Sequence, residues 1–275
     1  MKSPLKQSTQ AFTLIELSIV LVIVGLLAGG ILVGANLIKI AEIRSAIKQV
    51  EGIQTGINAF RLKYNCLPGD CANANNFGFE TRTGAPGHGN GNSLYENCNP
   101  LTSWNLQGCE TLLFWSDLSD AALIDGNFTT ATDANNTITA ANRSLYFPRS
   151  KLGSGYFMVY NTTNVTFPWL GQYQNFLGQY QNYLALIDIS GTIDASGVSP
   201  LPSLTPTQTF AIDSKLDDGK PMSGKVLGGT YQNSGFFPGT YPGAPGASVD
   251  DTDCTLDADR YNTPSLLMLI RSYAC

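Results

Sequence analysis

The feature that most constrains this chain is an apolar run near its N-terminus that contains no charged residue. It extends from Leu17 to Ile38 and reads LSIVLVIVGLLAGGILVGANLI. As a helix, such a run is long enough to cross a hydrocarbon core of about 30 Å. Lys2 and Lys6 precede it, and the positive-inside rule places such residues in the cytoplasm. We therefore predict a single membrane-spanning helix, with the rest of the chain outside the cytoplasm.

A cleaved secretory signal peptide is the alternative interpretation, with cleavage near Ala28 or Ala35. The apolar region of such a peptide is usually about 7 to 15 residues long, which is shorter than the run seen here. Glu16 also argues for a retained helix. A carboxylate costs roughly 2.5 to 3.5 kcal/mol at mid-membrane, so by default it has a function and a partner.

Helical periodicity continues beyond the apolar run. Apolar residues at intervals of three and four form one stripe, charged residues take the opposite face, and Pro68-Gly69 supplies a stop. We predict one continuous helix from Phe12 to Tyr64, roughly 80 Å long at 1.5 Å per residue, whose second half packs on a soluble body. The stripe contains Ile40, Ile43, Ile47, Val50, Ile53 (or Gln54), Ile57, Phe60 and Tyr64, and the opposite face contains Glu42, Arg44, Lys48, Glu51 and Arg61.

Charge divides the 275 residues into two parts. Up to Tyr64 there are seven Lys/Arg and three Glu, whereas the remainder carries nine Lys/Arg and eighteen Asp/Glu. An acidic body argues against nucleic-acid binding, which needs clustered Lys/Arg to neutralise phosphates. We therefore predict no nucleic-acid partner, and a front end that meets a membrane.

The string QAFTLIELSIVLVIVGLLAGG resembles the N-terminal processing and methylation segment of type IV pilins and type II secretion pseudopilins. Leader length, Phe12, the glutamate four residues on and the apolar run all agree. The resemblance implies that a prepilin peptidase cuts between Ala11 and Phe12, that the new amine of Phe12 is methylated, and that the helix is retained. The expected domains are a leader (1–11), a transmembrane and assembly half (12–38), an amphipathic half (39–64) and an extracytoplasmic head (65–275).

The resemblance also implies a role for Glu16, which would pair with the N-terminal amine of a neighbouring subunit and set the register of assembly. The competing interpretation is a tolerated carboxylate near the helix start, where negative charge suits the dipole. Two positions depart from the family pattern: Ala11 stands where glycine is common, and Val33 stands where many members have a proline. The missing proline favours a minor or specialised subunit over an abundant shaft pilin.

The predicted function is therefore that of a structural subunit, a pilin or pseudopilin, of a type IV pilus or a type II secretion-like filament. Its expected partners are prepilin peptidase, other subunits and the bacterial inner membrane, with the head at the cell surface or in the periplasm after assembly. The alternative is a membrane-tethered binding or adhesion protein that does not polymerise. Its ligand surface would be the tandem GQYQNFL-GQYQNYL at 171–184, unless these tyrosines only pack in an extended insertion.

All six cysteines follow the apolar run, and an even number outside the cytoplasm predicts disulfides. Sequence cannot choose among the pairings, and zinc is a weaker use because a second closely spaced pair is missing. The C-terminal pair resembles the disulfide-bounded loop of many type IV pilins. Proximity favours Cys66 with Cys71, Cys98 with Cys109, and Cys254 with Cys275.

The body is predicted to be α+β, with a small antiparallel sheet packed on the amphipathic half of the long helix and with long disulfide-bonded loops. Segments rich in Gly, Asn, Thr and Pro at 72–97, 126–142 and 233–253 are expected to be loops. Apolar runs bounded by turn residues predict strands at Tyr156–Tyr160, Tyr183–Ile189 and Leu266–Ser272, and helical spacing predicts helices at Thr111–Ala122 and Thr207–Leu216.

Catalytic motifs are not evident, so we predict no enzyme and no cofactor other than calcium. His88 lies in the glycine-rich string GAPGHGNGNS, without the strand or the Lys-Ser/Thr of a phosphate-binding loop, and no GxSxG occurs. Calcium candidates are Asp213, Asp217 and Asp218 before a glycine turn, because calcium takes carboxylate oxygens from such loops. A helix-ending turn is the competing interpretation of these aspartates.

Overall fold

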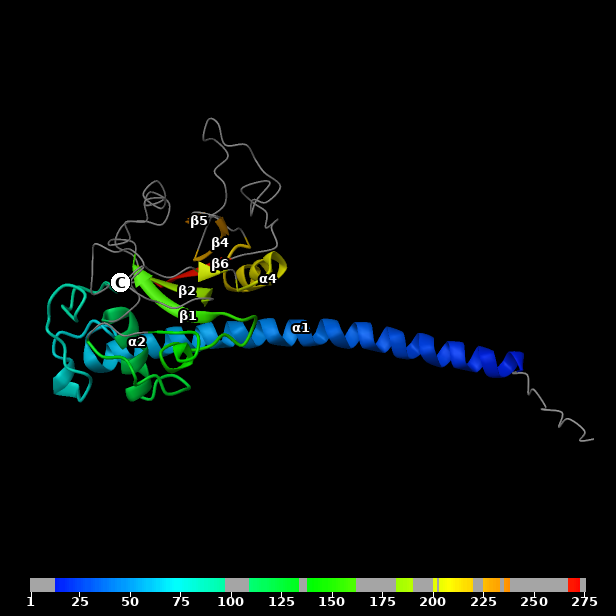
Figure 1. The fold of residues 1–275 in the computed structure, drawn as a ribbon, viewed down its shortest axis with the longest axis horizontal. Coiled ribbons are helices and arrows are strands. Elements are labelled where there is room, and N and C mark those ends of the chain that lie inside the picture. Colours follow the sequence, from blue (N-terminus) through cyan, green and yellow to red (C-terminus); the bar gives the residue numbers. More distant parts are fainter. Residues whose placement is uncertain are drawn as a thin grey trace, which may run out of the picture. The chain divides into compact units, whose positions relative to one another are not determined.

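The computed structural model describes residues 13–96, 109–133, 138–161, 182–189, 200–201, 203–219, 225–232, 235–237 and 267–272. The chain divides into two compact units, Met1–Glu42 and Ile43–Cys275, and helix α1 (Leu14–Tyr64) contributes to both. The other helical elements are η1 (Ala74–Phe77), α2 (Glu110–Asp120), η2 (Arg143–Leu145) and α4 (Pro206–Leu216), and the strands are β1 (Tyr156–Asn161), β2 (Asn182–Ile189), β3 (Pro200–Leu201), β4 (Val226–Gln232), β5 (Gly235–Phe237) and β6 (Leu267–Ser272) (Figure 1).

Within the second unit, α1 buries the predicted apolar stripe. Val50, Ile53, Ile57 and Phe60 are buried in the core, and the neighbouring members of the stripe are partly buried. The charged residues of the opposite face are exposed. Ile40, which belongs to the first unit, is the exception and is 46% exposed. The 3.6-residue period therefore predicted correctly which side of this helix packs on the body.

The sheet of the head is antiparallel throughout, in the order β1-β2-β6-β4-β5, with β3 pairing on β2 (Figure 1). The register places Val159 opposite Leu184 and Leu184 opposite Ile270. The three predicted strands are present, with ends that shift by one residue or less. Strand β4 was not predicted, because its sequence VLGGTYQ contains two glycines, which are depleted in strands.

Helices α2 and α4 also form where helical spacing predicted them. Thr205 and Gln208 build a capping box at the start of α4, and Pro206 occupies the first turn, where its missing amide costs no hydrogen bond. Every residue of α2 from Glu110 to Leu118 is buried, which includes two carboxylates. The α+β fold with a long apolar N-terminal helix, an antiparallel sheet and a disulfide is thus confirmed.

Candidate functional site

The first segment with a functional signature is the N-terminal part of α1. Among the residues that the structure describes, this is the one helix long and apolar enough to cross a membrane. Its most apolar window of 18 residues has a mean hydropathy of 2.7, and none of that window is buried in the chain itself. Because exposed apolar surface of this extent is unfavourable in water, the segment needs lipid or other apolar helices around it.

Glu16 lies in the first turn of α1 and forms a capping box with Thr13. One carboxylate oxygen accepts hydrogen bonds from the backbone amide and from the hydroxyl of Thr13, both at 2.8 Å, and the Glu16 amide donates to that hydroxyl at 3.3 Å. These bonds satisfy amides that have no partner within the helix. Glu16 therefore caps its own helix, while its exposure leaves the carboxylate accessible. The predicted processing residues Ala11 and Phe12 lie outside the described residues.

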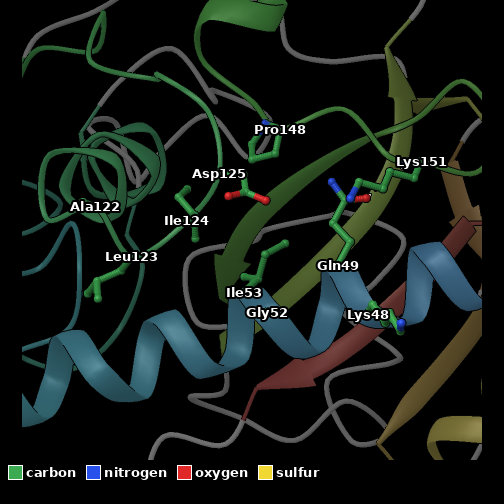
Figure 2. A pocket seen from close by; sticks show the side chains of 10 residues that line it. All are labelled: Lys48, Gln49, Gly52, Ile53, Ala122, Leu123, Ile124, Asp125, Pro148 and Lys151. Carbon is green, nitrogen blue, oxygen red and sulfur yellow. Dashed lines mark hydrogen bonds between the residues drawn. The ribbon is translucent and has the colours of Figure 1, made fainter.

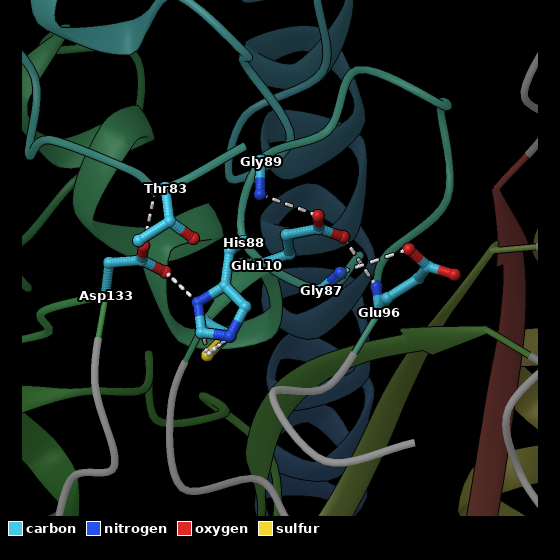
Figure 3. Close-up of polar contacts among 8 residues, drawn as sticks. Thr83, Gly87, His88, Gly89, Glu96, Glu110 and Asp133 are labelled. Carbon is cyan, nitrogen blue, oxygen red and sulfur yellow. Dashed lines mark hydrogen bonds and ion pairs between the residues drawn. The ribbon is translucent and has the colours of Figure 1, made fainter. Parts of the chain in front are cut away.

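The head contains a second unusual feature, a loop at residues 87–96 that surrounds buried carboxylates (Figure 3). We call it the carboxylate-bound loop. Glu110, the first residue of α2, accepts the backbone amides of Gly89 at 2.8 Å and Glu96 at 2.7 Å on its two oxygens. The Glu96 side chain in turn accepts the amide of Gly87 at 3.2 Å. The loop is thus attached to the start of α2 through its main chain.

Asp70 completes this arrangement from the other side of the loop. Its two oxygens accept the amides of Gly91 at 2.7 Å and Ser93 at 2.6 Å. Gly87, Gly89 and Gly91 all have positive φ values, between 71° and 79°, and this conformation turns successive amides toward one side. Such concave sets of amides bind anions, and here the anions are side chains of the same chain. The glycine-rich string is therefore a self-filled anion nest.

Burial changes the protonation of these carboxylates. Glu110 and Asp70 are 0% and 1% exposed. Burial raises the pKa of Glu110 to about 9, and repulsion from Asp70 acts in the same direction. Burial likewise raises the pKa of Asp70 to about 6, against the lowering effect of the amides that it accepts. The amides of Gly89 and Glu96 oppose the shift of the Glu110 pKa, and through these two bonds Glu110 holds the loop on α2.

A buried ion pair lies on the next turns of α2. Asp117 accepts the Arg82 guanidinium at 2.5 Å, and the two side chains are 1% and 0% exposed. The other oxygen of Asp117 accepts the amide of Gly69 at 2.6 Å. Burial raises the pKa of Asp117, and the guanidinium and the amide oppose that shift. Since Gly69 lies between Cys66 and Cys71, this carboxylate ties the disulfide-closed turn to the core.

The His88 ring contacts one carboxylate within the described part of the chain. Its Nδ1 lies 2.7 Å from Asp133, whose other oxygen accepts the amide of Thr83 at 3.0 Å (Figure 3). The sulfur of Cys109 is 3.5 Å from the same ring nitrogen. These three side chains are close enough for a metal ion, but Cys109 is disulfide-bonded and provides no thiolate, the form that metals bind. The geometry therefore supports a structural role for this histidine.

The disulfide predictions are tested in part. Cys66 and Cys71 form a disulfide with their Cα atoms 5.3 Å apart, as proximity predicted. Cys109 is a disulfide cysteine, and its predicted partner Cys98 lies outside the described residues. Cys254 and Cys275 lie outside them too, so their pairing stays a prediction.

The calcium candidates are brought together at the end of α4. Ligand atoms of Asp213, Asp217 and Asp218 all lie within 4.8 Å of one another. Asp217 is the C-terminal cap of α4, and its carboxylate accepts the amides of Lys225 and, at 3.3 Å, Val226. The expected helix-ending turn is therefore present, and calcium binding stays a prediction.

The tandem repeat is described only at its end. Asn182, Tyr183 and Leu184 form the start of β2 and are buried, and Asn182 bonds the carboxylate-bound loop through the amide of Tyr95 at 2.9 Å. Tyr183 is thus a packing tyrosine. The rest of the repeat lies outside the described residues.

The buried carboxylates of Asp70, Glu96, Glu110 and Asp117 were not singled out from the sequence, because no motif marks them. The available signal was the alternation of glycines at 87, 89 and 91, which is typical of main chain with left-handed residues. That alternation indicates an anion nest but does not identify the anion, since Asp70 and Glu110 are distant in sequence.

Comparison with known proteins bears on the N-terminal segment. Residues 6–32 match the family model of the prokaryotic N-terminal methylation motif, the signature of the prepilin-type cleavage segment. The chain thus carries the methylation motif found at the N-terminus of type IV pilin-like and pseudopilin precursors, and this motif implies processing by prepilin peptidase and assembly with other such subunits. With the exposed apolar helix, it fits a membrane-anchored, single-pass structural protein. No curated protein and no solved structure matches the chain significantly.

Proposed function

We propose that this protein is a minor or specialised pilin or pseudopilin, a structural subunit of a type IV pilus or a type II secretion-like filament. The observation that carries the proposal is the methylation motif at residues 6–32 on a helix that buries none of its apolar window in its own chain. Such a helix is suited to lipid before assembly and to neighbouring helices afterwards. Val33 in place of the usual proline supports a specialised subunit.

Processing supplies the group that Glu16 needs. Cleavage between Ala11 and Phe12 removes the leader 1–11 and creates an amine, which is then methylated, four residues before the carboxylate. In the membrane that carboxylate is costly unless a cation compensates it, and the amine of a neighbouring subunit is such a cation. The capping box with Thr13 supports this role, because it holds the carboxylate at the exposed start of the helix.

The head is proposed to lie outside the cytoplasm. Lys2 and Lys6 precede the membrane helix and orient it with its start in the cytoplasm. The Cys66–Cys71 disulfide supports the same side, since disulfides persist in oxidising compartments. The acidic, disulfide-bonded head is thus displayed in the periplasm or at the cell surface.

Mass spectrometry of the mature N-terminus tests the first step of this proposal. Co-expression with a prepilin peptidase is expected to yield a chain that begins with methylated Phe12, whereas the leader stays attached without the peptidase. A chain that keeps its leader in the presence of an active peptidase would contradict the proposal.

Assembly is tested with Glu16→Leu, which removes the carboxylate and makes the helix more apolar. Membrane insertion is expected to remain intact, while incorporation into sheared filaments is lost. Glu51→Leu is the matched control, because Glu51 is an exposed carboxylate on the same helix outside the apolar run. Equal incorporation of the two variants would refute the role of Glu16. A processed wild-type chain that is absent from every filament fraction would favour the non-polymerising tether.

A further inference from the structure

A pocket of about 450 Å³ lies on the head against the second half of α1 (Figure 2). Lys48, Gly52 and Ile53 of α1 form one wall. The segment 122–125, which follows α2, forms another, and the turn that precedes β1 forms the third. None of the contacts described above occupies this pocket.

The walls of the pocket are fixed by specific contacts. The side-chain amide of Gln49 donates to the Arg149 carbonyl at 2.8 Å and accepts the Lys151 amide at 3.0 Å, which attaches the turn before β1 to the helix. On the other side, a Cβ at Gly56 would lie 2.9 Å from the Leu123 carbonyl oxygen, so the segment after α2 approaches the helix backbone directly. The pocket is therefore a built feature of the head.

Charged groups without partners border an apolar floor. Asp125 points toward the pocket from one side, Lys151 lies on the other side, and Ile53 rises between them (Figure 2). Within the part of the chain that the structure describes, neither Asp125, Lys151 nor Lys48 has an ion-pair partner. The pocket thus offers one carboxylate and two ammonium groups to a group from outside.

Gly52 indicates that the group received from outside the chain approaches the backbone of α1 closely. It lies in the interior of α1, where glycine is less favourable than alanine, and a Cβ there would meet nothing within 4 Å. No contact among the residues that the structure describes requires glycine at this position. The missing side chain instead leaves the helix surface open at the pocket.

We propose that this pocket receives residues 38–42 of α1 from a second copy of the chain. Ile38 is 61% exposed, lies four residues before Glu42 on the same side of the helix, and provides an apolar group for the floor. Lys39 and Glu42 are three residues apart, which places them on one face of the helix. Lys39 then faces the carboxylate of the pocket, and Glu42 faces its ammonium groups.

This contact rests on the proposed function and adds to it. Glu16 sets register within the apolar part of the helix, whereas the pocket sets register where the helix meets a neighbouring head. Complementary charges confer specificity, because a shifted neighbour would place like charges together.

Charge reversal in the full-length protein tests the pairing. Asp125→Lys is expected to reduce the incorporation of this chain into sheared filaments by about tenfold or more, since like charges then face each other between copies. Adding Lys39→Glu to the same chain restores assembly, because the reversed pair meets again between copies. Glu51→Lys makes the same change of charge outside the pocket and is expected to leave assembly unchanged. Equal effects of Asp125→Lys and Glu51→Lys, or no rescue by Lys39→Glu, would overturn the inference.

Two further variants separate the contact from folding and from filament formation. Gly52→Leu introduces a side chain whose Cβ would meet nothing within 4 Å and removes a glycine from the helix interior. The Tm is therefore expected not to fall while assembly is lost, and normal assembly would count against the inference. Lys39→Cys with Asp125→Cys is expected to give disulfide-linked dimers in membranes, and Lys39→Cys with Glu51→Cys none. Dimers without filaments would support the contact while refuting the proposed function. Filaments that show neither cross-link nor charge effect would refute the contact alone.

Discussion

Gly69→Ala is a sharp test of how the disulfide-closed turn is held on the core. Gly69 has a φ of +85°, a left-handed conformation that costs other L-residues about 1 to 2 kcal/mol. An alanine Cβ there would lie 2.9 Å from the Phe114 amide nitrogen and closer still to the Glu110 carbonyl oxygen. Both atoms belong to the backbone of α2 and cannot rotate away, so the turn must separate from the helix.

The cost of that separation follows from the contacts it breaks. The Gly69 amide donates to the buried carboxylate of Asp117 at 2.6 Å, and a hydrogen bond to a charged group contributes about 1.5 to 3 kcal/mol. Overpacking adds about 1 to 3 kcal/mol. Gly78→Ala is the matched control, because Gly78 has a φ of +84° but nothing within 4 Å of a Cβ. We expect Gly69→Ala to be less stable than this control by about 2.5 to 6 kcal/mol.

Thermal unfolding of the two variants in detergent measures this difference. The buried Trp115 on α2 provides a fluorescence signal close to the perturbed contact. For a chain of this size, 1 kcal/mol shifts the Tm by about 2 to 4 °C, so Gly69→Ala should unfold at least about 5 °C below Gly78→Ala. Equal Tm values would show that the turn is not held against α2 as described.

Three further outcomes are expected. Burial raises the pKa of Glu110 to about 9 and that of Asp70 to about 6. The stability that these two groups contribute is therefore fully present below their ordinary pKa values of 4.5 and 3.8 and is lost as the pH rises through the raised values. The Tm should fall between about pH 4 and pH 9, and a Tm that rises over this range would contradict the assignment. Asp117→Asn should destabilise the head by about 3 to 5 kcal/mol in denaturant unfolding, because it leaves the buried Arg82 charge uncompensated, and a loss below 1 kcal/mol would refute the buried pair. If calcium binds at the end of α4, millimolar calcium should raise the Tm, and Asp213→Asn should abolish this increase. An unchanged Tm would mean that these carboxylates only form the helix-ending turn.

The elements predicted correctly are those that local patterns define. Helix α1 repeats apolar residues at helical intervals over its whole second half, so its extent and its buried face follow from the order of residues alone. The methylation motif is contiguous, and Cys66 and Cys71 are close enough in sequence for proximity to pair them. The three strands are apolar runs between turn residues.

The interior of the head was decided by tertiary structure. Asp70, the carboxylate-bound loop and Glu110 meet only because the fold brings distant segments together, and what each carboxylate binds is a backbone amide, which every residue type except proline possesses. Such a partner leaves no mark on composition or spacing. The two glycines of β4 make its sequence unlike that of a strand, and the strand forms because β6 provides its hydrogen bonds. The sequence by itself therefore determined the long apolar helix, its methylation motif and its packing face, whereas long-range main-chain contacts determined the carboxylate-bound loop and the pocket beside α1.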